Sequence, residues 1–284
     1  MSQIAIGLVQ TGTVPGAPES NRGRLNEMAR TAFRHGANLV ILPELGVSGY
    51  DLGVGDGTAA GAEPVPGPST DAWVQLCRDH DGWICGGICE RAGPDLFDSA
   101  VLVGPDGVLL VYRKLHLFGH EKTVFRPGDF GLPVVDLPFG RVGALVCYDL
   151  RFPEVVRILA LQDAEVVCVP TAWVTGFDRI AYDAGGMPPQ ARNVLVQANL
   201  NQIFIAAASQ VGVQGELRFL GASLLADPRG EAALGPLSIE DDDVVVAAID
   251  VASAKGARSR GELISPRADR RPDVYSLRYE GRDL

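Results

Sequence analysis

Three side chains with complementary chemistry each follow a predicted strand. Glu44 follows the run NLVILP, Lys114 follows VLLVYR, and Cys147 follows RVGALV. Ligand sites in α/β proteins lie beyond the carboxyl ends of strands, so we expect these groups to meet at one site. A cysteine is most often a core residue and a lone charged group is most often solvated. The combination instead indicates a thiol nucleophile with an acid and an ammonium beside it.

Other catalytic arrangements fit the sequence less well. There is no G-x-S-x-G motif, and all four histidines precede Cys147, which disfavours a papain-like pair. His116 and His120 are the best metal candidates, but they lack an evident third ligand, and the cysteine spacing completes no zinc set. We therefore predict no metal and no cofactor, and Glu44 is the available base for the thiol.

The elements that would position these residues follow from hydrophobic spacing and turn signals. Early strands alternate with helices, and the turn at 104–107 predicts a hairpin. About ten strands favour two stacked mixed sheets, an α-β-β-α sandwich in a single domain over residues 1–284. Strands are predicted at 4–9, 38–42, 82–89, 99–103, 108–112, up to 146, 166–169, 203–208, 222–226 and 244–251, and helices at 21–35, 70–80, 153–162 and 189–199.

Composition narrows the possible partners and location. The chain has 284 residues, a net charge of −10 and a pI near 4.9, which disfavours nucleic acid and anionic lipid. No window approaches the ~18 consecutive apolar residues of a membrane span. Five irregularly spaced cysteines and the absence of an export signal at the N-terminus predict a cytoplasmic protein.

Several motifs occur together and in order along nearly the whole chain. They are PEL at 43–45 with GY at 49–50, YRKLHLF at 112–118, RPGD at 126–129, CYDLRFPE at 147–154, and later FLGASLLADPRGE and RRPDVY. This set resembles the nitrilase superfamily of carbon-nitrogen hydrolases. The resemblance implies a four-layer α-β-β-α sandwich with two mixed β-sheets, and a homodimer or larger homo-oligomer. It also implies a catalytic triad of Glu44, Lys114 and Cys147, with Glu121 as an additional glutamate near the lysine.

Those roles suggest a mechanism for hydrolysis of a small amide to a carboxylic acid and ammonia. Glu44 would remove the thiol proton, and Cys147 would attack the carbonyl carbon. Lys114 and the backbone N–H of Tyr148 would stabilise the oxyanion. Glu44 would protonate the leaving amine and then activate the water that cleaves the acyl-thioester.

The substrate is less closely defined. The sequence after the cysteine resembles amidase and carbamoyl-hydrolase branches more than true nitrilases, in which Trp-Glu typically follows. Arg151 could bind a substrate carboxylate, as an omega-amidase or an N-carbamoyl amino acid or ureido-acid amidohydrolase needs, or it could pair with an acid such as Glu154. The expected pocket residues are aromatic: Tyr50, Phe118, Trp173 and Phe177.

The sequence also leaves open two functions of other classes. A metal-dependent hydrolase would use His116, His120 and acids, and would be sensitive to chelators. A non-catalytic binding member would keep the site but release no ammonia. The sequence leaves open which amide is used and whether the acidic composition reflects a saline or cold habitat.

Overall fold

Two sheets form the centre of the protein in the computed structural model, which describes residues 2–50, 57–176, 178–179, 182–184 and 186–284. In this part of the chain each sheet has six strands, ordered β14-β1-β2-β3-β4-β5 and β13-β12-β9-β8-β7-β6. The first comprises β1 (Gln3–Gln10), β2 (Leu39–Ile41), β3 (Trp83–Ala92), β4 (Asp95–Gly104), β5 (Gly107–Arg113) and β14 (Asp243–Asp250). The second comprises β6 (Val134–Leu137), β7 (Gly140–Ala144), β8 (Val166–Thr171), β9 (Phe204–Ser209), β12 (Leu224–Ala226) and β13 (Ala232–Leu234).

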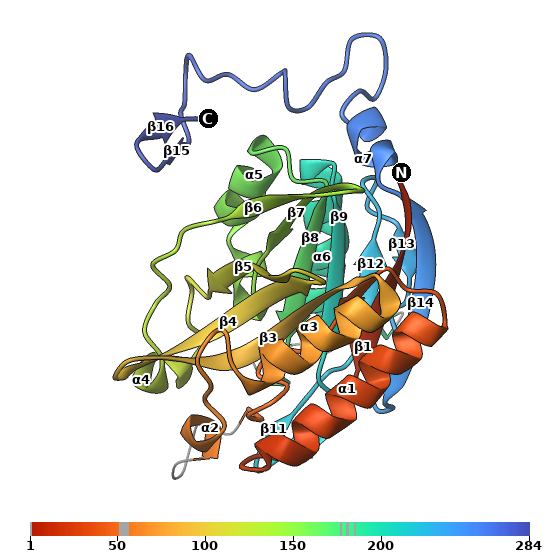
Figure 1. The fold of residues 1–284 in the computed structure, drawn as a ribbon. Coiled ribbons are helices and arrows are strands. Elements are labelled where there is room, and N and C mark those ends of the chain that lie inside the picture. Colours follow the sequence, from red (N-terminus) through yellow and green to blue (C-terminus); the bar gives the residue numbers. More distant parts are fainter. Residues whose placement is uncertain (1, 51–56, 177, 180–181, 185) are drawn as a thin grey trace.

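Helices cover the outer faces of the two sheets. Figure 1 shows α1 (Pro18–Arg34) and α3 (Pro68–His80) over the first sheet, while α5 (Pro153–Leu161) and α6 (Pro189–Asn201) belong to the second. The apolar inner faces pack together, with β1 against β9 and β3 against β8. The predicted four-layer α-β-β-α sandwich with two mixed sheets is confirmed.

The strand directions bring the carboxyl ends of several strands to the same end of each sheet. Strands β1, β2 and β3 run parallel, and β5 runs the same way because β4 is antiparallel to both of its neighbours. In the second sheet β7, β8 and β9 run parallel. The predicted hairpin of β4 and β5 is confirmed.

Some boundaries differ from the sequence-based expectation. Helix α1 begins at Pro18, three residues before the predicted start, because proline suits a first helical turn. Asn21 instead binds the carbonyls of Val14 and Val47. Helix α3 begins at Pro68, two residues before the predicted start, and is capped by Gly67, whose N–H donates to Thr70 Oγ1 at 2.8 Å.

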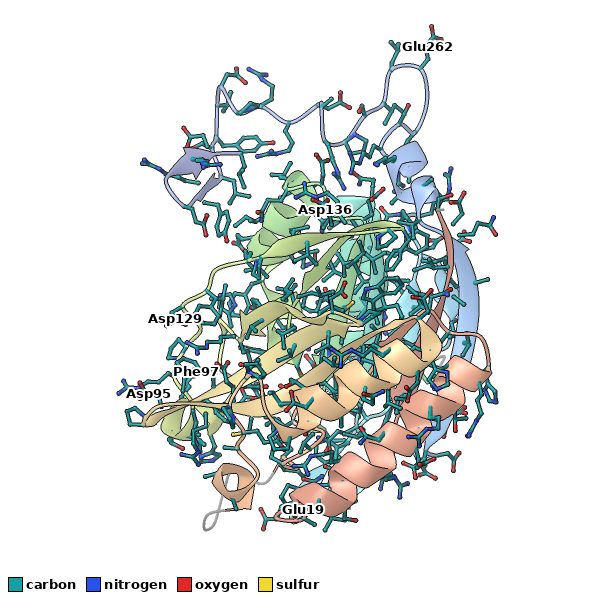
Figure 2. The ribbon with its side chains drawn as sticks, viewed as in Figure 1. Glu19, Asp95, Phe97, Asp129, Asp136 and Glu262 are labelled. Atoms are coloured by element: carbon teal, nitrogen blue, oxygen red, sulfur yellow. The ribbon has the colours of Figure 1, made fainter. Side chains whose placement is uncertain are left out.

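The short elements were not foreseen. They include edge strands β6 and β13, the ribbons β10 (Val213–Gln214) with β11 (Leu217–Arg218) and β15 (Arg278–Tyr279) with β16 (Arg282–Asp283), and the helices α2 (Gly57–Ala60), α4 (Glu121–Val124) and α7 (Ala252–Ala257). The chain after α7 extends beyond the sandwich at Glu262 (Figure 2) and then returns to it, where Arg267 donates to Ala160 O and the Tyr279 hydroxyl accepts the Leu132 N–H. Among the described residues no helix is long and apolar enough to cross a membrane.

Candidate active site

Glu44, Lys114 and Cys147 lie at the carboxyl ends of strands that run in matched directions. Glu44 comes three residues after β2, and Lys114 comes directly after β5 in the same sheet. Cys147 comes three residues after β7 in the facing sheet, where it opens the 3₁₀ helix η1 (Cys147–Arg151). The predicted meeting of strand ends is therefore present in the fold.

The ammonium of Lys114 lies at the centre of the site. Its Nζ is 2.5 Å from Glu44 Oε1, 2.7 Å from Glu121 Oε1 and 3.0 Å from Asp98 Oδ2, and all four side chains have no exposed surface. An ammonium has three N–H donors, and the three carboxyl groups accept all of them. In this arrangement Lys114 contributes its positive charge to the site. Its Nζ can donate a hydrogen bond to a substrate oxyanion only after one of the three carboxyl groups gives up its own bond to Nζ.

Asp98 was missed by sequence reasoning. The strand containing it was expected to begin at residue 99, whereas β4 begins at Asp95 and places Asp98 opposite Cys89. The sequence did contain a signal for Asp98, which directly precedes the apolar run SAVLV and could therefore belong to the same buried strand. A buried acid usually has a charged or hydrogen-bonding partner, which would have marked Asp98 as a candidate site residue.

Glu121 is held by donors in addition to Lys114. Its Oε2 accepts the Phe118 backbone N–H at 2.7 Å, and its Oε1 accepts the hydroxyl of Tyr50. Burial raises the pKa of Tyr50 well above its usual value, so Tyr50 keeps the proton that it donates. Glu121 thus links Lys114 to two residues of the pocket wall, Tyr50 and Phe118.

Burial and charge shift the ionisation of this cluster. Although burial alone lowers the pKa of Lys114, the carboxylates of Glu121, Glu44 and Asp98 raise it well above its ordinary value. Burial raises the pKa of both Glu121 and Asp98 above their ordinary values. Lys114 is therefore charged.

The thiol of Cys147 has the surroundings of a base-activated nucleophile. Burial and the charge of Glu44 raise its pKa well above the ordinary value, and Lys114 and a backbone hydrogen bond from Ala172 only partly offset this. The resting group is a thiol, so the ammonium alone does not generate a thiolate. Cys147 also has a φ of 44°, a left-handed conformation that is uncommon outside glycine.

Hydrogen bonds from the ends of β8 and β9 hold the backbone of Glu44. The Glu44 N–H donates to Thr171 O at 3.3 Å, and Gln210 Nε2 donates to Glu44 O at 2.8 Å. Both partners belong to the second sheet, so these bonds join the sheets at the site. A Cβ on Gly87 of β3 would lie 2.5 Å from Glu44 Cα, which explains the glycine there.

The histidines have other surroundings. His116 Nδ1 is 2.8 Å from Asp149 Oδ1, and its ring stacks on Phe152 at 3.6 Å. Asp149 also accepts Tyr112 Oη at 2.7 Å and the N–H of Val146 at 3.2 Å. Asp149 thereby ties the end of β5 to the turn that carries Cys147.

A metal does not fit the acidic cluster. A metal site needs several histidine, cysteine or acidic side chains whose ligand atoms lie close together. Within the described residues, one such group is present, and it consists of Glu44, Asp98 and Glu121. The Lys114 ammonium bonds to all three, so the position of a cation is taken by a side chain. His116 and His120 are not members of this group.

A pocket of about 430 Å³, open mouth included, leads to Cys147. The structure places the predicted residues Tyr50, Phe118, Tyr148, Arg151 and Trp173 in its wall. Phe177 lies outside the described residues. The wall also contains residues that were not predicted: Leu150, Ala172, Val174, Gln190 and Asn193.

The guanidinium of Arg151 has an internal partner. Its Nη2 is 2.5 Å from Asp178 Oδ2, and both side chains are about three-quarters buried, with 29% and 26% of their surface exposed. Of the two alternatives left open by the sequence, the structure shows pairing with an acid, and that acid is Asp178 instead of the example named, Glu154. A substrate carboxylate would have to compete with Asp178 for this guanidinium.

Comparison with known proteins agrees with this geometry. The profile of the family described as carbon-nitrogen hydrolase matches residues 5–259. The chain belongs to this family. This carbon-nitrogen hydrolase is 34% identical over 273 residues to a nitrilase of Pyrococcus abyssi, covering 96% of this chain and 99% of that one. It is 32% identical to an (R)-stereoselective amidase of a Pseudomonas species, covering 93% and 91%.

A solved structure of an amidase from a Nesterenkonia species has the same fold. It superposes on this carbon-nitrogen hydrolase with a TM-score of 0.76 at 27% identity, covering 95% of this chain and 94% of that one. A glutamate-to-glutamine variant of that amidase carries acrylamide added at its active-site cysteine by Michael addition. These matches place the hydrolase in the nitrilase superfamily.

Proposed function

We propose that this carbon-nitrogen hydrolase converts small neutral amides with an apolar acyl group to carboxylic acid and ammonia through an acyl-thioester on Cys147. The observation that carries the proposal is the contact of Lys114 with Glu44 and Glu121, whose charges act on Cys147 in the wall of the pocket. An acid, an ammonium and a thiol in one buried site are the groups that acyl transfer needs.

The first half-reaction forms the thioester. Glu44 removes the Sγ proton, and the sulfur attacks the carbonyl carbon. The Lys114 charge and the Tyr148 backbone N–H stabilise the negative charge that develops on oxygen. Glu44 then gives its proton to the departing nitrogen, the C–N bond breaks, and ammonia leaves.

The second half-reaction regenerates the enzyme. Glu44 removes a proton from water, and the hydroxide attacks the thioester carbon. The C–S bond breaks as the thiolate leaves, and the proton on Glu44 returns to sulfur, while the acid product leaves as the carboxylate with release of its own proton. The raised pKa of Cys147 favours this last step, because the free thiol is the stable resting form.

Pocket chemistry supports a neutral substrate. Its wall is largely apolar, and Arg151 is paired with Asp178. The buried oxygen Gln190 Oε1, which has no hydrogen-bond partner in the described part of the chain, is an acceptor for an amide N–H. A nitrile offers no such donor. We therefore expect amides to be preferred over nitriles and over carboxylated substrates.

Ammonia release from short aliphatic amides, aliphatic nitriles, dicarboxylic monoamides and N-carbamoyl amino acids tests the proposal. We expect the highest kcat/KM for the aliphatic amides, with no release by the Cys147→Ala variant. Cys77→Ala, a change of the same type in α3 remote from the pocket, is the matched control. Ammonia release by Cys147→Ala would overturn the mechanism, and a preference for dicarboxylic monoamides would overturn the substrate class.

A further inference from the structure

The charges around Lys114 do not balance if every carboxyl group is ionised. One ammonium and three carboxylates, none with exposed surface, give a net charge of −2 in the interior. Buried like charges disfavour full ionisation, so at least one of the three carboxyl groups holds a proton.

Hydrogen-bond partners show which group is ionised. Glu121 accepts from Lys114, from the Phe118 N–H and from the Tyr50 hydroxyl. Three donors stabilise its charged form. Glu44 and Asp98 each accept a single hydrogen bond from Lys114, through Oε1 and Oδ2. The proton therefore belongs to this second pair of side chains.

Each member of that pair has one oxygen left over. Glu44 Oε2 and Asp98 Oδ1 are buried and have no hydrogen-bond partner in the described structure. The Asp98 and Glu44 carboxyl groups lie within hydrogen-bonding reach of each other, so two ionised groups there would repel. A single proton shared between the two carboxyl groups gives them a hydrogen bond and removes one buried charge.

We propose that Asp98 is a positioning residue that carries this proton and donates it as a hydrogen bond to the carboxylate of Glu44. The proposal deepens the proposed function, on which its catalytic consequence rests. A donor from Asp98 keeps Glu44 ionised, as a general base must be before it accepts the Cys147 proton. It also orients the carboxylate, because Lys114 and Asp98 then hold one oxygen each.

The surroundings of Asp98 agree with a neutral side chain. The titratable and charged groups that face it are Lys114, Glu44, Glu121 and, across the strand pair, Cys89. Burial raises the pKa of Asp98 most strongly, and Glu44 and Glu121 raise it further against the opposing effect of Lys114. Glu44, in contrast, must exchange a proton with the thiol in each cycle.

Infrared difference spectra of resting protein at neutral pH test the protonation without any turnover. Wild type minus Asp98→Asn should show a protonated carboxylic acid C=O band. Glu63→Gln is the control, because Glu63 is buried but accepts from Arg22 and Ser69, and its difference spectrum should show ionised carboxylate bands. Ionised carboxylate bands for Asp98 would overturn the proposal, whatever the substrate of the enzyme.

Carbon-13 NMR of wild type labelled at the aspartate carboxyl carbons covers the case in which Asp98→Asn does not fold. One aspartate should retain the protonated chemical shift at neutral pH. If every aspartate carboxyl carbon has the ionised shift, the proposal is wrong.

Kinetics test the positioning role. Asp98→Ala should lower kcat about tenfold or more, the effect of losing one charge-assisted hydrogen bond, and should raise the acidic pKa of the kcat/KM profile. Asp98→Asn, whose amide can still donate, should recover most of the kcat lost in Asp98→Ala. Equal losses in both variants would contradict donation from Asp98.

Discussion

Cys147 is a neutral thiol in a site that contains both a cation and three carboxyl groups. Its raised pKa results from burial first and from Glu44 second, and Lys114 opposes both. Glu44 therefore has two effects: it disfavours the thiolate at rest and accepts the proton during attack. These effects can be separated by replacing the carboxylate with an amide.

Glu44→Gln should abolish ammonia release yet increase the rate at which iodoacetamide alkylates Cys147 at pH 8. The amide cannot accept the thiol proton in turnover, but removal of the negative charge lowers the Cys147 pKa and increases the thiolate fraction. Quenching the reaction at timed intervals and mapping the peptides measures the rate of Cys147 alkylation. In wild type Cys147 should react first, because the other four cysteines are buried. Slower alkylation in Glu44→Gln would contradict the charge effect.

At the scale of elements, close approach of β3 to the chain after β2 positions the base. Gly87 N–H donates to Pro43 O at 3.2 Å, and Gly46 N–H donates to Gly87 O at 3.1 Å. These bonds need a residue without Cβ at position 87.

Gly87→Ala should lower both stability and kcat. The new Cβ meets the Glu44 backbone at 2.5 Å, so the chain carrying the base must move. We expect a loss of about 1–3 kcal/mol in the free energy of unfolding, typical of overpacking. Urea unfolding and ammonia release measure the two effects. Gly23→Ala in α1, where a Cβ meets nothing within 4 Å, should instead be neutral or stabilising. Equal behaviour of the two variants would contradict the argument.

Elements also explain which site residues the sequence reveals. Glu44, Lys114 and Cys147 each follow a run of apolar residues, so strand ends could be located and their meeting predicted. Asp98 lies inside a strand, and its role depends on side chains more than a dozen residues away. Asp178 lies in a segment without regular structure, so its pairing with Arg151 has no local signal. Contacts between distant segments depend on tertiary packing, which spacing does not reveal.

At the scale of the whole molecule, the two sheets repeat one pattern. In each, an edge strand is antiparallel to the first of three parallel strands, and two further antiparallel strands follow. The sequence contains no internal repeat that would predict this shared strand order. The pattern brings the carboxyl ends of both parallel sets to the site.

Buried thiols outside the site should make the fold sensitive to alkali. Burial raises the pKa of Cys77 from 9.0 to about 12. The unfolded chain loses this proton first, so it binds fewer protons than the folded chain between these values. Stability should therefore fall as pH rises from 9, by up to about 1.4 kcal/mol per pH unit for this thiol. Urea unfolding should show a shallower decline for Cys77→Ala. Identical slopes would contradict the shift.

Association of two or more chains stays a prediction. Val196 and Leu200 on α6 are 47% and 49% exposed, which is consistent with an outer-helix contact. We expect wild type to sediment as a dimer or larger species and Val196→Glu/Leu200→Glu to dissociate it, because buried unpaired charges are costly. The matched control is Val14→Glu/Val213→Glu, at exposed sites outside α6. A monomeric wild type would contradict this.

Intact-protein mass spectrometry of the enzyme quenched during turnover of a short aliphatic amide tests the central claim most directly. The account predicts a mass increase equal to the acyl group, located by peptide mapping on Cys147 and absent from Cys147→Ala. A wild-type enzyme that releases ammonia with no acyl adduct on Cys147, together with a Cys147→Ala variant that still turns over, would contradict it.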